Sequence, residues 1–353
     1  MPIIRCRYIS TADSRGFSLM EVVLAAAIMA IVMPAIIMLL NHTNKGFAGF
    51  EAFNSLKTMN ENTVNRMYLR LGRCKRLFQN DTMGTAMLSN MMMTGAPAKM
   101  IGSRLPVVLQ NGSLTPGTTS FDGTAFGNSM LLAYNSETRV MDNISDSAST
   151  PSTCTVRVDL YKFAYYYLTP SGSPSIGGKQ TYKNTEWESI SYADCGQLTT
   201  ISNSQKRSKS IVALYDGGVR YCWNSSASAY NVSFSSLVVT GTGSAAAGSV
   251  FSAPGHKAQK NSVKTLTSLV MGIMGGAYQY GVSANTAGMT GNTRTVPAFA
   301  TTSGTFPAGF EVGVIGPTAG RKVLVRSVIY ASGPMNRPIM DEKLIIAVAR
   351  DIW

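Results

Sequence analysis

The sequence predicts an α+β fold in which a long N-terminal helix packs on an antiparallel β-sheet with large loop-rich insertions. Apolar residues first form an unbroken run and then recur at spacings of three and four as far as residue 79. After residue 80 the pattern changes to short alternating segments separated by turn-forming residues. We therefore expect four parts, namely residues 1–16, a first helical half over 17–40, an amphipathic continuation over 41–79 and a β-rich head over 80–353.

The first helical half is long enough to cross a membrane. Residues 17–40 form an apolar run of 24 residues in which Glu21 is the only charge. As a helix this run spans about 36 Å, against about 30 Å for a hydrocarbon core. Arginines precede the run at Arg5, Arg7 and Arg15, which agrees with the positive-inside rule. A secretory signal peptide fits less well because its apolar core is shorter, and a plain signal anchor leaves Glu21 unexplained.

The residues at the start of this run resemble a known family. Gly16-Phe17-Ser18-Leu19-Met20-Glu21, preceded by Arg15, is similar to the prepilin signature of type IV pilins and type II secretion pseudopilins. The resemblance covers residues 12–45. It implies that residues 1–16 are a leader, that a prepilin peptidase cuts between Gly16 and Phe17, and that Phe17 is then N-methylated. It also implies partners, namely this peptidase, other pilins or pseudopilins, and an inner-membrane assembly platform with its ATPase.

Glu21 acquires a role in filament assembly from this resemblance. Cleavage frees an α-amine at Phe17 within the membrane, and Glu21 of a neighbouring subunit supplies the anion that this buried charge needs. The pair would set the register of one helix against the next. Pro34 lacks an N–H, so we expect it to kink or loosen the helix.

The amphipathic continuation over 41–79 has one apolar stripe that includes Leu56, Met67 and Leu71. Its other side carries Arg66, Arg70 and Arg73, which we expect to be exposed. Two interpretations remain open for these arginines, a solvated face or a strip that binds anions or nucleic acid.

The head is expected to consist of short strands. Candidate strands lie at 105–110, 129–134, 155–168, 232–240, 322–331 and 343–349. Residues 211–215 and 219–223 flank Asp216-Gly217-Gly218 and predict a β-hairpin. Residues 241–318 are rich in Gly, Ser, Thr and Ala, and we interpret them as a loop-rich insertion.

Five cysteines indicate an exported protein. Cys6 leaves with the leader, and the remaining four predict two disulfides with three possible connectivities, at Cys74, Cys154, Cys195 and Cys222. We favour Cys154 with Cys195 and Cys74 with Cys222, and the alternative for Cys74 is a buried thiol.

No catalytic set, cofactor motif or metal-ligand spacing stands out, so we expect neither an enzyme nor a cofactor. The net charge of +13 favours anionic partners without identifying one, and nucleic acid stays possible but unsupported. The predicted function is that of a structural subunit, a minor pilin or pseudopilin of a type IV pilus or type II secretion filament. The alternative is a tip-binding module, an adhesin or DNA-uptake subunit, on the same anchor. We expect a single-pass inner-membrane protein before assembly and a periplasmic or cell-surface filament afterwards.

The size of the head favours a position near the filament tip. Past residue 80 the chain has about 270 residues, for which a compact body has a radius of gyration of about 18 Å. Such a head is bulky for a closely repeated lattice, whereas at the tip nothing lies above it.

Overall fold

The computed structural model describes residues 18–91, 93–100, 102–111, 125–144, 154–170, 182–225, 234–237, 257–267, 270–273, 276–282, 309–332 and 338–349. The chain divides into two units, Met1–Phe50 and Glu51–Trp353. A long N-terminal helix followed by an antiparallel sheet confirms the predicted α+β class.

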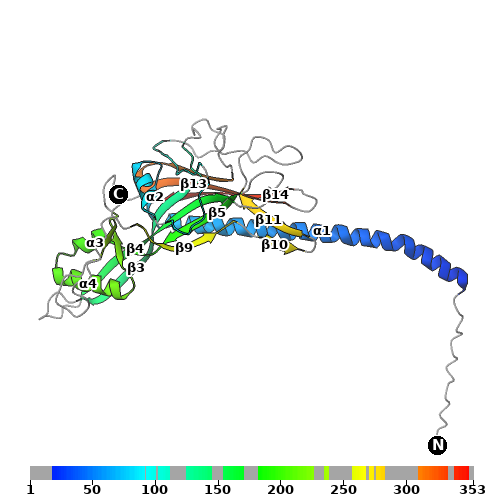
Figure 1. The fold of residues 1–353 in the computed structure, drawn as a ribbon, viewed down its shortest axis with the longest axis horizontal. Helices are drawn as coiled ribbons and strands as arrows, with labels where there is room; N and C mark the ends of the chain where they lie inside the picture. The colour runs from blue at the N-terminus through cyan, green and yellow to red at the C-terminus, as the bar shows by residue number, and fades with distance from the viewer. Residues whose placement is uncertain are drawn as a thin grey trace, which may run out of the picture. The chain divides into compact units, whose positions relative to one another are not determined.

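The long helix α1 (Leu19–Gly72) contains 54 residues and forms the blue part of the ribbon in Figure 1. Leu, Ala and Met, which favour helix, dominate its first half. The helix continues through Pro34. It ends at Gly72, seven residues before the predicted boundary at residue 79, because the next residues join the sheet as β1 (Cys74–Phe78) and pair with β3.

The head is built on one large sheet. Its strands are β2 (Val108–Leu109), β3 (Met130–Ile144), β4 (Cys154–Pro170), β5 (Tyr182–Ser189), β6 (Tyr192–Asp194), β7 (Tyr221–Trp223), β8 (Phe234–Ser236), β9 (Lys260–Thr265), β10 (Val270–Ile273), β11 (Gly276–Val282), β12 (Phe310–Ile315), β13 (Arg321–Ser332) and β14 (Pro338–Ala349), together with β1. The pairings are antiparallel except those of β2 with β12 and of β6 with β7. The long strand β4 lies between β3 and β5.

Alternation along β4 explains why the sheet is covered on both faces. Ala164, Tyr166 and Leu168 join a core that includes Met67 and Leu71 of α1. The intervening residues Phe163, Tyr165 and Tyr167 join a second core that includes Met83 and Met87 of α2 (Thr82–Asn90). Because side chains alternate between the faces of a strand, one apolar segment serves both layers.

A smaller lobe packs against the C-terminal end of β3 and the N-terminal end of β4. It contains α3 (Cys195–Thr200) and α4 (Ser204–Asp216), and Figure 1 shows both helices beside these strands. The predicted hairpin is therefore wrong, since residues 211–215 belong to α4. Asp216-Gly217-Gly218 ends this helix, with Gly217 as the C-cap and Gly218 at a φ of +89°.

One further difference concerns the strands. The sequence predicts a loop-rich insertion over 241–318, whereas the described part of this range contains β9, β10, β11 and β12. Strand β12 is fully buried, and it pairs with β13 from Phe310 opposite Ser327 to Ile315 opposite Lys322. The predicted strands at 155–168, 322–331 and 343–349 correspond to β4, β13 and β14.

Candidate functional site

The first turn of α1 is closed by two reciprocal hydrogen bonds between Ser18 and Glu21. The N–H of Ser18 donates to Glu21 Oε2 over 2.9 Å, and the N–H of Glu21 donates to Ser18 Oγ over 3.3 Å. This arrangement is a capping box, in which each side chain satisfies a backbone donor of the other residue. Glu21 therefore already stabilises its own helix, a role that the family resemblance does not imply. Gly16 and Phe17, the predicted cleavage and methylation positions, lie outside the described residues.

The segment that follows the cap exposes a continuous apolar surface. Between Leu19 and Leu40 its large apolar side chains are 44–86% exposed. The most apolar window of 18 residues in α1 has a mean hydropathy of 2.8, and none of it is buried. A core helix of a soluble protein would be buried, so this segment is better explained as a candidate membrane span. Residues 41–72 of the same helix carry most of its polar and charged side chains.

Beyond Glu51, α1 is held to the sheet by buried ion pairs. Arg66 contacts Glu186 of β5 at two points, with 2.5 Å from Nε to Oε2 and 2.8 Å from Nη2 to Oε1. Arg70 Nη1 lies 2.9 Å from Glu186 Oε2, and its Nη2 contacts Glu188. The two arginines are four residues apart on a helix and the two carboxylates two residues apart on a strand, so each pair faces the other.

The predicted exposed arginine strip is therefore wrong for two of its three members. Arg70 is 8% exposed and Arg66 is half-buried against Glu186, whereas Arg73 is exposed. The strip interpretation assumed that arginines on a helix face water. Glu186 and Glu188 are far away in sequence and gave no signal that they would meet this helix.

Glu188, which pairs with Arg70, also receives hydrogen bonds from two other residues. Its carboxylate accepts hydrogen bonds from Tyr134 Oη at 2.9 Å and from Asn261 Nδ2 at 3.0 Å. Burial by itself raises the pKa of this carboxyl group. The Arg70 charge and the Tyr134 hydrogen bond lower it by more, so the net pKa is below its ordinary value. Burial is also the main reason why the pKa of Tyr134 is raised. Glu188 is thus kept ionised inside the head.

Polar contacts between α1 and the sheet continue towards the N-terminus. Asn60 is fully buried, and its Nδ2 donates to the Ser327 carbonyl at 3.2 Å and to Asp341 Oδ2 at 2.8 Å. Thr63 Oγ1 donates to the Met59 carbonyl within the helix at 2.9 Å and shares this proton with the Leu266 carbonyl at 3.3 Å. We call Asn60, Thr63, Arg66 and Arg70 the polar seam. These residues connect α1 to β5, β13, β14 and the segment after β9.

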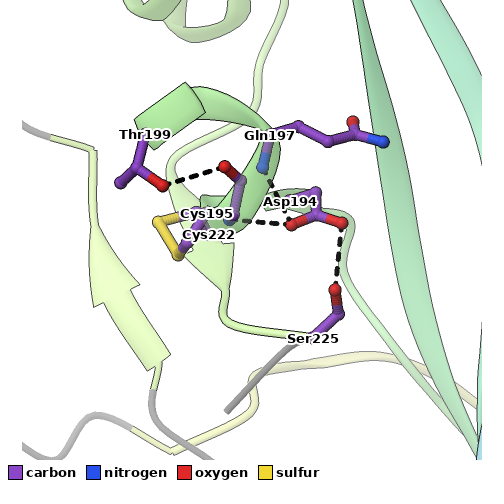
Figure 2. The surroundings of a disulfide bond; sticks show 7 residues. Asp194, Cys195, Gln197, Thr199, Cys222 and Ser225 are labelled. Carbon is purple, nitrogen blue, oxygen red and sulfur yellow. Dashed lines mark hydrogen bonds between the residues drawn. A yellow bond between two sulfur atoms is a disulfide. The ribbon is translucent and has the colours of Figure 1, made fainter. Parts of the chain in front are cut away.

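A disulfide joins α3 to β7 in the smaller lobe. Cys195 at the start of α3 is bonded to Cys222 of β7, 27 residues later (Figure 2). Asp194 caps α3 by accepting from the N–H groups of Gly196 and Gln197, and it also accepts from Ser225 Oγ at 3.0 Å. This carboxylate orients the turn that carries Cys195.

The predicted pairing of the cysteines is wrong. Cys195 bonds to Cys222 rather than to Cys154, and neither Cys74 nor Cys154 is part of a disulfide. Cys74 is buried in the core beneath α1, in agreement with the alternative of a buried thiol. Cys154 begins β4 and lies against Lys206.

Comparison with protein-family models, with curated proteins and with solved structures finds no match for this chain. Within the described ranges, no group of three or more His, Cys, Asp or Glu side chains is placed to hold a metal ion. The best-defined functional features are therefore the capped apolar segment of α1 and the polar seam that joins its continuation to the sheet.

Proposed function

We propose that this chain is a structural subunit of a filament of the type IV pilus or type II secretion kind, inserted through α1 and displaying the sheet as its head. The observation that carries the proposal is the wholly exposed apolar surface of α1 between Leu19 and Leu40, which begins within the turn closed by Ser18 and Glu21. Such a surface needs either lipid or other apolar helices around it. A subunit that moves from membrane to filament core meets both in turn.

The architecture of the head supports the same proposal. The polar seam and the core around Met67 and Leu71 attach the second half of α1 to the sheet, so a helix inserted into a filament carries its head with it. We further propose a position near the tip in few copies, because of the size of the head. Mass spectrometry of sheared filaments would contradict this position if the chain proved to be their most abundant pilin.

N-terminal processing tests the proposal directly. Mature protein isolated from membranes should begin at Phe17 and carry an N-methyl group. Replacing Gly16 by Leu should leave the full-length chain in the membrane. Gly46 is a matched control, because it lies within α1 and a Cβ added there would meet no other atom within 4 Å, so Gly46→Ala should be processed normally. A wild-type N-terminus at any other residue would contradict the family assignment.

A further inference from the structure

Strand β14 carries an exposed apolar stripe. In the described part of the head, four large apolar side chains are exposed, and three of them, Leu344, Ile346 and Val348, belong to this strand. These three side chains are 43–59% exposed. The residues between them point to the other face, where Ile345 and Ala347 pack in the core beneath α1. We call Leu344, Ile346 and Val348 the β14 stripe.

The same face of the sheet is covered one strand away. Leu324 of β13 is paired with Ile346 and is fully buried in a cluster with Phe126. Ile346 itself is 50% exposed. The cover therefore ends between β13 and β14, and the β14 stripe is the part of this apolar face that faces water.

Strand β14 is also an edge of the sheet. Among the described strands it pairs only with β13, and it lies near β1 without pairing with it. Charged residues, Pro and bulges normally protect sheet edges against association with other strands. The stretch from Leu344 to Ala349 contains no charged residue and no Pro. The outer N–H and C=O groups of this stretch can therefore pair with an added strand.

Charges of opposite sign lie at the two ends of the β14 stripe. Glu342 precedes it, and its side chain is 46% exposed although Arg326 Nε lies 2.8 Å from it. Lys322 of β13 is exposed and is paired with Val348 at the other end. A complementary strand would place apolar side chains on the stripe, a basic residue near Glu342 and an acidic residue near Lys322.

Lipid and a symmetric second copy fit this edge less well. Lipid hydrocarbon does not tolerate a sheet edge with open backbone groups. The second half of α1 and β14 run in the same direction, because Asn60 contacts Asp341 and the later Leu71 shares a core with Ala349. A two-fold antiparallel pairing of β14 would therefore point the two α1 helices in opposite directions. Subunits inserted through α1 into one filament share one direction.

The β14 stripe is too small to hold a free partner by itself. A stable interface buries about 800 Å² on each partner, and three half-exposed side chains fall well short of this area. A contact of this size becomes effective when another attachment already holds the two molecules side by side. Neighbouring subunits of one filament meet this condition, because their helices are inserted next to each other.

From these observations we propose that β14 accepts an added strand from the head of a neighbouring subunit, a different chain of the same filament. The added strand places alternate apolar side chains on the β14 stripe and carries a basic residue at the Glu342 end and an acidic residue at the Lys322 end. This inference rests on the proposed function, because insertion into a filament is what brings the two heads together.

Site-specific photo-crosslinking in filaments tests the proposal. Benzoylphenylalanine replaces Ile346 in the full-length chain, which is expressed with its filament system, and the sheared filaments are irradiated. We expect a cross-link to the head of another subunit, at an extended segment with alternating apolar residues. The same probe at Val140 is the matched control, since Val140 is 49% exposed and lies on β3, and it should give no such cross-link.

A second pair of variants tests the stripe without a probe. Ile346→Lys places a charge where the added strand would bury it, so the amount of the neighbouring subunit that co-purifies in detergent should fall by about tenfold or more. Val140→Lys should leave this amount unchanged. Equal co-purification with both variants would contradict the role of the β14 stripe.

Immunoblots of the same sheared filaments separate two kinds of failure. A chain that reaches filaments but gives no cross-link at Ile346, or an equal one at Val140, would overturn the inference and leave the proposed function intact. Absence of the chain from filaments would contradict the proposed function, and the inference with it. A cross-link from Ile346 to a second copy of this chain would refute a different subunit as the partner.

Discussion

Arg66 and Glu186 meet through two parallel contacts of 2.5 and 2.8 Å where α1 crosses β5, although 120 residues separate them in sequence. The side chain of Glu186 is fully buried, and Arg70 approaches the same carboxylate from the next turn of the helix. One carboxylate thus compensates two guanidinium groups.

Replacing Glu186 by Gln should destabilise the head strongly. The change leaves the Arg66 and Arg70 charges without their shared anion, and breaking a buried ion pair typically costs about 3–5 kcal/mol. Chemical denaturation of the full-length chain in detergent would measure the free energy of unfolding. Glu137→Gln is the matched control, since Glu137 is exposed and lies 3.4 Å from Arg139, and its loss should cost about 0–1 kcal/mol. Equal effects of the two changes would contradict the buried network.

Acid should weaken the same region through Glu188. Its pKa is lowered in the folded protein from an unfolded value of 4.5, so its contribution to stability is fully present above pH 4.5 and is lost as the pH falls through the folded pKa. We expect the free energy of unfolding of the wild type to fall more steeply below pH 4.5 than that of Glu188→Gln. Parallel curves for the two proteins would contradict an ionised Glu188.

Two substitutions at Glu21 separate its capping role from its proposed role in assembly. Gln can still form the capping box, whereas Val cannot, and neither carries a charge. If pairing with the Phe17 amine of a neighbour drives assembly, both variants should insert into the membrane but fail to enter filaments. Immunoblots of membrane and sheared-filament fractions provide the measurement. Incorporation of Glu21→Gln at the wild-type level, with Glu21→Val still excluded, would show that the cap, and not the charge, is what assembly needs.

Removing the Cys195–Cys222 disulfide should loosen the smaller lobe. A disulfide typically contributes about 2–4 kcal/mol, mainly by restricting the unfolded chain. The double variant with Ser at both positions should be cleaved by protease near α3 and α4 under conditions in which the wild type resists. Unchanged resistance would mean that Asp194 and the lobe core suffice to hold the turn.

The sequence predicted those elements whose own residues form a local pattern of apolar side chains. The alternating aromatic residues of β4 and the apolar run of α1 are local patterns, and both were confirmed as elements. Ser18 and Glu21 also form a local pattern, and the capping box could have been recognised from their spacing alone. The favoured disulfides failed because connectivity depends on how α3 and β7 meet in space.

Strand β5 shows why other elements could not be predicted. Its sequence Tyr182–Ser189 is mostly polar and charged, which is typical of a loop, yet Glu186 and Glu188 are buried. Both carboxylates are compensated by arginines of α1, which lie more than a hundred residues earlier. Local propensity was overridden here by tertiary contact.

The polar seam has a mechanical consequence. Apolar contact is non-directional, so a helix held by it alone can slide a little along a sheet at small cost. The hydrogen bonds of Asn60 and Thr63 and the ion pairs of Arg66 and Arg70 are directional, and a slip of one helical turn, about 5.4 Å, breaks all of them together. Tension applied along the second half of α1 is therefore transmitted to β5 and β13 without slippage.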